Sequence, residues 1–460
     1  MAKDMTKGSP WRLLLGFSIP LLIGNIFQQL YNLADAVIVG KTLGADALAA
    51  VGATGSVMFL VFGFYFGLTG GLTVVTGQRF GAGDPEGVRK SVAASTIICA
   101  ILSLVSTFAC VAATPLILRL MNTPDAIYAE SHTYMSAMFW GTATIVFYGL
   151  VSSILRALGD SMTPLVFLIV SCLLNIGLDL LFIRAFGWGV GGAAWATVIA
   201  QALSALLCLA YMLWRYPMLR LRTCNWNVCP AFYLEHLRVA MPMALQFSIT
   251  AVGIVVLQAA LNRFGATYIA AVTAANKIDS IAIQPMFSFS MAMAAYAAQN
   301  YGARDVGRIR RGTWSCAIMS LAFAVPMGVV LILFAKPLVR LFLDDPSEEI
   351  LQAAQTFMNI NCGFYVVLDL LLIYRNVLQG MGYTFYPLMA GVAELILRVV
   401  AAIFLAQSWG YPGVCFAHPL AWFGATAVLL ADYLVVMRHL RRHGIPDKDG
   451  LVRRTEALAD

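Results

Sequence analysis

The most regular feature of the chain is a succession of long apolar runs separated by short polar connections. Each run is long enough to cross about 30 Å of hydrocarbon as a helix, which needs roughly 20 mostly apolar residues. The pattern predicts an all-α integral membrane protein. Its twelve predicted spans lie near residues 13–39, 47–76, 91–118, 133–155, 163–184, 190–214, 236–261, 267–297, 313–335, 352–374, 384–407 and 413–437.

The two halves of the chain repeat one another at a spacing of about 222 residues. Each copy holds six spans, an even number, so both copies should insert with the same orientation. We therefore expect them to be related by a pseudo-two-fold axis along the membrane normal. The aligned stretches are IPLLIGN (19–25) with MPMALQF (241–247), TGQRFGAGD (76–84) with AAQNYGARD (297–305), GDSMTP (159–164) with GYTFYP (382–387), and GWGVGGAAWA (187–196) with SWGYPGVCFA (408–417).

The repeat predicts how the chain divides into domains. Two six-helix bundles around a cleft that opens alternately to either side are the architecture expected of a transporter. In the first span, Pro20 removes a backbone hydrogen bond, and we predict a helix kink there. The predicted parts are an N-terminal lobe at 1–220, a cytoplasmic linker at 221–235, a C-terminal lobe at 236–440 and a cytoplasmic tail at 441–460.

Composition and charge agree with a membrane protein and give it an orientation. Hydrophobic residues make up 60% of the chain and charged residues 12%, against about 25% charged in soluble domains. With both termini in the cytoplasm, most of the 30 Lys and Arg residues lie inside. The positive-inside rule therefore predicts a multi-pass protein of the cell membrane with cytoplasmic termini. The net charge of +7 is then a topology signal and gives no reason to expect a nucleic-acid partner.

Two aspartates, Asp35 and Asp179, lie in the middle of otherwise apolar spans. The second copy has Leu257 and Ala401 at the equivalent positions. A carboxylate surrounded by hydrocarbon is costly, and intramembrane ionisable residues are usually functional. Because the second copy builds the same fold without them, the two aspartates are the candidate working site of a transporter.

Other polar residues share helical faces with the two aspartates. In the first span Gln28, Asn32 and Asp35 are spaced by four and three residues, and in the fifth span Asn175 and Asp179 are four apart. These spacings place each set on one side of its helix. We predict that all five contribute to ion coupling.

Two hydroxyl groups from neighbouring spans are predicted to join this site: the phenol of Tyr134 and the alcohol of Thr197. Carboxylate, amide and hydroxyl oxygens replace the hydration shell of Na⁺, so Asp35, Asn175 and Asp179 are the predicted metal ligands if the coupling ion is Na⁺. The same residues serve a proton relay equally well, because neighbouring carboxyl groups titrate as a pair. A purely structural hydrogen-bond network is the third interpretation.

The second copy carries buried charges of its own. Asp369 in the tenth span and Asp279 in the eighth are candidates for a second-lobe ion or substrate site. Glu394 and Arg398 are four residues apart in the eleventh span and can form an ion pair. No G-x-x-x-x-G-K-[ST] phosphate loop occurs, so an ion gradient or a separate partner must supply the energy. We expect no cofactor besides the coupling ion, and no enzyme activity.

The first copy contains four distinctive motifs: QQLYNLADAVIVGKTLGADALAAVG in the first span, GQRFGAGD, RALGDSMTP, and LNIGLDLLF followed by GVGGAAWATVIAQ. These motifs resemble those of the MATE (multidrug and toxic compound extrusion) family. The chain is most similar to the DinF-like and MepA-like prokaryotic branch, whose site lies in the N-terminal lobe. Asp35, Asn175 and Asp179 match the acidic and amide positions of that site. The NorM-like branch has a glutamate in the seventh helix, where this chain has no acid, although Asp369 resembles that branch's tenth-helix aspartate.

The resemblance implies a secondary active multidrug efflux antiporter. Such a protein exports small organic, often cationic compounds in exchange for H⁺ or Na⁺ by alternating access, and we expect it to act as a monomer in the lipid bilayer. A lipid or lipid-linked oligosaccharide flippase on the same architecture is the alternative, and it predicts several cations for a pyrophosphate headgroup. A membrane scaffold or receptor is a third hypothesis, which gives no reason for the acidic pair.

Overall fold

The computed structural model describes residues 4–343 and 345–446, and within these ranges the chain forms helices and turns without strands. The N-terminal half contains α1 (Pro10–Leu43), α2 (Ala45–Gly81), α3 (Pro85–Leu120), α4 (Asp125–Trp140), α5 (Thr142–Ala157), α6 (Met162–Asp179), the π-helix η1 (Leu180–Ala185), α7 (Gly189–Arg215) and the 3₁₀ turns η2 (Pro217–Leu219) and η3 (Thr223–Trp226). The C-terminal half contains α8 (Pro230–Leu261), the 3₁₀ turn η4 (Asn262–Phe264), α9 (Ala266–Ala282), α10 (Gln284–Gly302), α11 (Val306–Arg340), α12 (Glu348–Gly363), α13 (Tyr365–Gly380), α14 (Phe385–Val400), the π-helix η5 (Ala401–Leu405), α15 (Ala406–Trp409), α16 (Tyr411–Cys415) and α17 (Ala417–His443).

The predicted fold class is confirmed. Nine helices are long and apolar enough to cross a membrane singly, and three bent pairs raise the number of spans in the described part of the chain to as many as 12. The pairs α4–α5 and α12–α13 are bent by 48°, and α9–α10 is bent by 43°. Proline does not explain the first two bends, which fall at Gly141 and Phe364. Pro20 lies inside α1, which is a continuous helix, so the kink predicted there stays a prediction.

The internal contacts divide the chain into two compact units that differ from the predicted lobes at two helices. The first unit comprises Ile23–Ala244, and the second comprises Met5–Leu22 together with Leu245–Pro446. Helices α1 and α8 therefore each contribute to both units, and each changes unit two residues after a proline, Pro20 or Pro242.

Burial explains why the two helices divide in this way. Leu14 and Phe17, in the first half of α1, are buried in the core of the second unit. Ala240 and Ala244, in the first half of α8, are buried in the core of the first unit. The predicted linker at 221–235 runs into α8, which begins at Pro230, and the predicted tail begins inside α17. Residues 447–460 of that tail lie outside the described residues.

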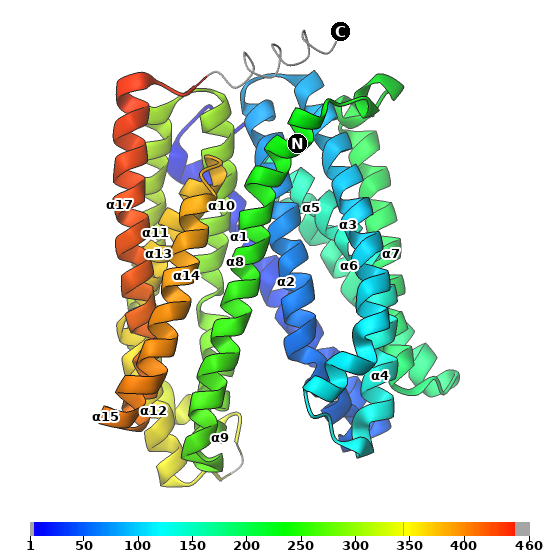
Figure 1. The fold of residues 1–460 in the computed structure, drawn as a ribbon, viewed down its shortest axis with the longest axis vertical. Helices are drawn as coiled ribbons and strands as arrows, with labels where there is room; N and C mark the ends of the chain where they lie inside the picture. Colours follow the sequence, from blue (N-terminus) through cyan, green and yellow to red (C-terminus); the bar gives the residue numbers. More distant parts are fainter. Residues whose placement is uncertain (1–3, 344, 447–460) are drawn as a thin grey trace. The chain divides into compact units, whose positions relative to one another are not determined.

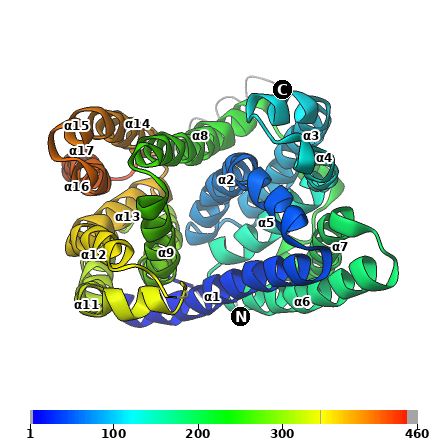
Figure 2. The same ribbon diagram turned by 90° about the horizontal axis from the view of Figure 1, so that it is seen from below.

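Within the first unit, the short helix α5 occupies the middle. It contacts α2, α3 and α7, and in the end-on view of Figure 2 it lies among them. The helix α13 is its counterpart in the second unit and packs against α10, α11 and α17, which run alongside it in Figure 1. The repeat seen in the sequence is thus a repeat of helix packing.

The turns of the two copies are also built alike. Gly159 and Gly382, at aligned positions, adopt positive φ angles of 83° and 86°, which a glycine adopts without strain. Asp84 and Asp305 cap the following helices, each accepting a hydrogen bond of 2.8 Å from the backbone N–H three residues ahead. Aligned residues therefore have the same local function in both units.

Close packing between α2 and α8 in the first unit gives a stability prediction. A Cβ atom on Gly67 would lie 2.6 Å from the carbonyl oxygen of Met243, so backbone would have to move. We expect Gly67→Ala to destabilise the protein by about 1–3 kcal/mol, the usual cost of overpacking a core. On the same helix Gly55 has no neighbour within 4 Å, and Gly55→Ala should stabilise instead because alanine favours helix. Thermal unfolding of both variants in detergent checks this, and equal effects would contradict it.

Candidate functional site

The two mid-span aspartates come from α1 and α6 of the first unit, and the fold brings them together. Their carboxyl groups are hydrogen-bonding partners. Asp179 is fully buried, and one carboxyl oxygen of Asp35, Oδ1, is buried without a hydrogen-bond partner in the described part of the chain. Two carboxyl groups that share a hydrogen bond need one proton between them, so the two aspartates titrate as a pair.

Thr197 on α7 is the centre of the neutral part of the same site. Its hydroxyl accepts a hydrogen bond of 3.2 Å from the side-chain amide of Asn175 and shares one of 3.1 Å with the phenol of Tyr31. Asn175 and Thr197 are buried, with 1% and 7% of their surfaces exposed. The phenol of Tyr134 on α4 is also buried and interacts electrostatically with both aspartates. Four helices thus supply carboxyl, amide and hydroxyl groups to one cluster.

Two other residues of the predicted site, Gln28 and Asn32, contact each other on α1. The side-chain amide of Gln28 donates to Asn32 at 3.3 Å, and Asn32 is exposed. Tyr31, one residue before Asn32, contacts the cluster because it lies one helical turn before Asp35 and on the same side of α1. The polar pattern of the sequence does not single out Tyr31, although its four-residue spacing from Asp35 is the signal that could have found it. A contribution of Gln28 and Asn32 to ion coupling stays a prediction.

The start of α6 is fixed by the RALGDSMTP turn. The carboxylate of Asp160 accepts hydrogen bonds from the backbone N–H of Met162, at 3.1 Å, and of Thr163, at 3.0 Å. The phenol of Tyr216, which follows α7, donates to the same carboxylate at 2.5 Å. Burial, together with the nearby carboxylate, raises the pKa of Tyr216, so the phenol stays protonated and can donate. The turn therefore ties α6 to the end of α7, the two helices that carry Asn175 and Thr197.

The end of α6 is also unusual. Directly after Asp179 the chain continues as the π-helix η1. Segments of π-helix are rare in proteins, and those that occur often lie at functional sites. The second unit has a π-helix, η5, at the equivalent place after α14. The irregular turn is thus part of the repeated fold, and the acidic residue in front of it is specific to the first unit.

In the second unit, each predicted aspartate has a hydroxyl partner from another helix. Tyr365 on α13 donates to Asp279 on α9, and Ser320 on α11 donates to Asp369 on α13. Asp369 is fully buried, and its second oxygen has no hydrogen-bond partner among the described residues. These two carboxyl groups stay candidates for a second ion or substrate site.

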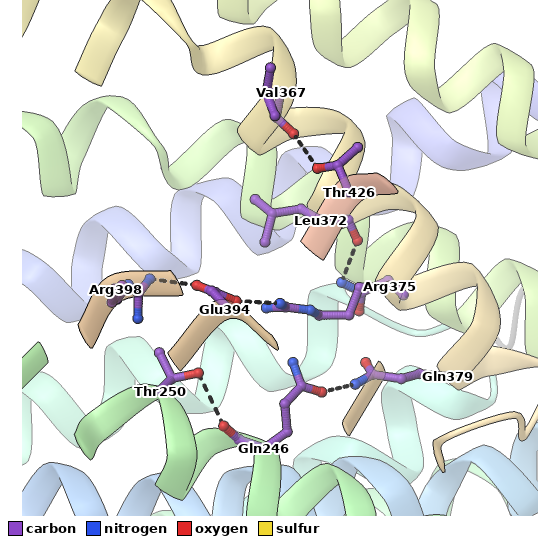
Figure 3. A network of polar contacts seen from close by, with 10 residues as sticks. Gln246, Thr250, Val367, Leu372, Arg375, Gln379, Glu394, Arg398 and Thr426 are labelled. Carbon is purple, nitrogen blue, oxygen red and sulfur yellow. Dashed lines mark hydrogen bonds and ion pairs between the residues drawn. The ribbon is translucent and has the colours of Figure 1, made fainter. Parts of the chain in front are cut away.

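The predicted pair of Glu394 and Arg398 is confirmed and belongs to a larger network (Figure 3). Glu394 accepts from Arg398 at 2.5 Å through Oε1 and from Arg375 on α13 at 2.8 Å through Oε2. Beside it, the amide of Gln379 donates to that of Gln246 at 2.7 Å. Sequence reasoning missed Arg375, because the predicted tenth span ends at residue 374, whereas α13 continues to Gly380.

The donor atoms of the acidic cluster limit which ions it can hold. No group of three or more His, Cys, Asp or Glu side chains in residues 4–343 and 345–446 is arranged to bind a metal. The cluster around Asp35 offers two carboxyl groups, an amide and hydroxyl groups, all of them oxygen donors apart from the amide nitrogen. Oxygen donors suit hard cations, and the carboxyl pair suits a proton.

Comparison with known proteins decides the family. A sequence model of the MatE family matches residues 20–181 and again residues 242–404. The chain belongs to the MatE family. The two matches begin at Pro20 and Pro242, which are the residues that the internal repeat aligns. The MatE-family assignment confirms the predicted family and identifies the chain as a member of a family of multidrug efflux transporters, which are not enzymes.

Individual relatives agree with this assignment. The MatE-family protein is 28% identical to the probable multidrug resistance protein YoeA of Bacillus subtilis, over 94% of this chain and 95% of that protein. It is 28% identical to the probable multidrug resistance protein YpnP of the same organism, over 75% and 77% of the two chains. Its fold matches the outward-facing structure of a multidrug resistance MATE family transporter with a TM-score of 0.89 at 24% identity, over 95% of this chain and 98% of that one.

Proposed function

We propose that this MatE-family protein is a secondary active antiporter of the cell membrane that exports small organic, often cationic compounds in exchange for H⁺ or Na⁺. The observation that carries the proposal is the pair of hydrogen-bonded carboxyl groups, Asp35 and Asp179, buried within a membrane-spanning bundle. A buried acid pair within a membrane-spanning bundle is costly, and intramembrane ionisable residues usually mark ion pathways or proton relays. Similarity to proteins named for multidrug resistance supports the choice of substrate class.

Exchange follows from linkage between the ion and the substrate. If H⁺ or Na⁺ binds the Asp35–Asp179 pair in one conformation and the substrate favours the other, each ligand drives the release of the other. The hydrogen bonds of Asn175 and Tyr31 to Thr197 would change with the charge of the pair. Cytoplasmic termini and a monomeric state are part of the proposal, the former supported by the distribution of Lys and Arg.

The flippase alternative receives less support. The relatives compared above are named multidrug resistance proteins, and the MATE transporter of matching fold is described in the same terms. The acidic cluster of the first unit suits a cation better than the pyrophosphate of a lipid-linked sugar. Small-molecule export is therefore the function that the site supports best.

Transport by the purified protein in liposomes tests the proposal. We expect ethidium loaded into one compartment to be moved against its gradient when either a pH gradient or a Na⁺ gradient is imposed separately. A response to the pH gradient alone identifies H⁺ as the coupling ion, and a response to the Na⁺ gradient alone identifies Na⁺. Ethidium flux that is the same with and without each imposed gradient would refute the antiport mechanism. Empty liposomes and liposomes with a collapsed gradient are the controls.

A further inference from the structure

The second unit has an arginine and a histidine close to the positions where the first unit has its amide and hydroxyl groups. The repeat spacing is 222 to 223 residues in this region, which places Arg398 at or directly after the position equivalent to Asn175. The alignment of residues 187–196 with 408–417, continued by one residue, pairs Thr197 with His418. His418 interacts electrostatically with Arg398 and Glu394. The repeat has therefore kept a polar site at this level of the bundle, in which an arginine and a histidine stand close to the places of the amide and hydroxyl groups.

The two residues of α1 that belong to the acidic cluster are also replaced at the equivalent positions of α8. Asp35 is replaced by Leu257, and Tyr31 is replaced by Gly253. A Cβ atom on Gly253 would lie 2.7 Å from a terminal nitrogen of Arg398, so the guanidinium lies against the backbone of α8 in space that the missing side chain leaves open. An alanine at residue 253 would push the guanidinium away. The glycine and the arginine thus fit each other.

The guanidinium of Arg398 has hydrogen-bonding capacity left over. Its side chain is only 6% exposed, and its Nε–H group is buried without a hydrogen-bond partner among the described residues. Its one ion-pair partner within the described part of the chain, Glu394, shares its two oxygens with Arg375. An unsatisfied donor on a buried charged group is costly, and a guanidinium is suited to binding carboxylate or phosphate through two parallel hydrogen bonds.

A cavity in the second unit lies at the same place. Its volume is about 50 Å³, and its wall includes Leu257, Gln258, Asn276, Phe357 and His418. Two of these, Leu257 and His418, are the repeat equivalents of Asp35 and Thr197. The cavity is mostly apolar with a few polar groups, which is typical of sites for small organic molecules.

We propose that the second unit binds the negatively charged group of an organic solute, a phosphate or a carboxylate, with Arg398 as the residue that holds it and the neighbouring cavity as the place of the solute's apolar part. This assignment rests on the proposed export of organic compounds and extends the substrate class to molecules that carry an anionic group. Arg375 keeps Glu394 paired, so Arg398 can turn its remaining donors to the ligand.

Binding of riboflavin and flavin mononucleotide tests the assignment, since these fluorescent molecules differ by one phosphate group. The protein is reconstituted in nanodiscs of phosphatidylcholine, and binding is followed by flavin fluorescence. We expect wild type to bind flavin mononucleotide at least about tenfold more tightly than riboflavin, the effect of a hydrogen bond to a charged group. The absence of such a preference, including the absence of any binding, would overturn the proposal.

Variants of the protein show which residue causes the preference for flavin mononucleotide over riboflavin. Arg398→Gln should remove it and leave riboflavin binding unchanged, and Gly253→Ala should weaken it without changing any charge. Arg263→Gln, at an exposed arginine of the same unit, is the matched control and should keep it. A preference that survives in Arg398→Gln would refute the assignment. Folding of Arg398→Gln is expected because Glu394 keeps its contact with Arg375, and unchanged riboflavin binding verifies it.

Two further measurements distinguish a solute from a lipid headgroup and the anion site from the ion-coupling site. Phosphatidic acid added to the nanodiscs offers the same phosphate chemistry as a lipid headgroup, and competition by this lipid would overturn the assignment to a solute. Ethidium export driven by an ion gradient is measured with the same protein. Absence of this export in wild type would refute the proposed antiport and leave the flavin result standing, and the control variant Arg263→Gln should export ethidium as wild type does.

Discussion

Replacing Asp179 by asparagine should abolish gradient-driven efflux while the protein still folds. Asparagine keeps the shape of the side chain but can neither share a proton with Asp35 nor carry the charge that binds a cation. Coupling free energies between two ligands are typically about 1–3 kcal/mol, which is roughly a 5- to 150-fold effect of one ligand on the affinity for the other. Without coupling, accumulation of ethidium should fall to the level measured with no imposed gradient. Proteoliposomes with an imposed pH or Na⁺ gradient provide the measurement.

Three further variants test whether the loss of efflux is specific to the Asp35–Asp179 pair. Asp35→Asn should have the same effect, and the double variant should be no worse than either single one, because residues that act as a unit are not additive. Asp432→Asn, at a partly exposed acid of α17, removes a carboxyl group outside the cluster and should leave efflux intact. Unchanged efflux in both Asp35→Asn and Asp179→Asn would show that the acid pair is structural.

The second large effect is expected on stability. Glu394→Ala removes the carboxylate that pairs with both Arg375 and Arg398, all three of them nearly buried. Breaking a buried ion pair by removing one partner usually costs about 3–5 kcal/mol, because the remaining charge is left uncompensated. The variant should therefore unfold at a much lower temperature than wild type or fail to fold in detergent.

A thiol-reactive fluorogenic dye can follow this unfolding, since Cys316, Cys362 and Cys415 are buried in the second unit and react only when it opens. Glu348→Ala is the matched control. Its carboxylate contacts Lys336 at the same 2.5 Å but is exposed, so its removal should change the unfolding temperature little. Similar shifts in both variants would contradict the importance of burial. Replacing all three charged residues of the network by apolar ones of similar size should recover part of the stability.

These variants separate the two units by function. Asp179→Asn is expected to affect ion coupling and to leave the flavin preference of the second unit intact. Arg398→Gln is expected to remove the flavin preference and to leave the hydrogen bonds of the Asp35–Asp179 cluster in place. If the two sites respond independently, the internal repeat has produced one unit for the coupling ion and another for an anionic group of the solute.

Much of the fold could be predicted from the sequence because the membrane restricts the choices. Helices satisfy their own backbone hydrogen bonds in hydrocarbon, so apolar runs of sufficient length translate directly into spans. The bends of α4–α5 and α12–α13 could not be predicted, because no proline marks them. They depend on tertiary contact: at Gly141, for example, a side chain would collide with Val198 of α7.

The candidate site also has residues that could be predicted from the sequence and residues that could not. Asp35, Asn175 and Asp179 stand out because they are polar residues in apolar runs, and the structure brings them together with Tyr134 and Thr197. Tyr31 does not stand out, because a tyrosine in a membrane helix is common and only packing decides what its hydroxyl contacts. Arg375 was missed for a related reason: whether an arginine at the end of an apolar run lies inside a helix or beyond it depends on where the helix ends.

The twelve predicted spans, the internal repeat, the resemblance to the MATE family and the acidic residues of the first unit follow from the amino-acid sequence alone, since each depends on composition, spacing or similarity along the chain. The tertiary structure decided which half of α1 and α8 joins which unit, which hydroxyl groups complete the acidic cluster, and that Arg398 takes the space left by Gly253. These features depend on contacts between residues far apart in the chain. Such contacts follow from the packing of whole helices, and local sequence patterns do not contain them.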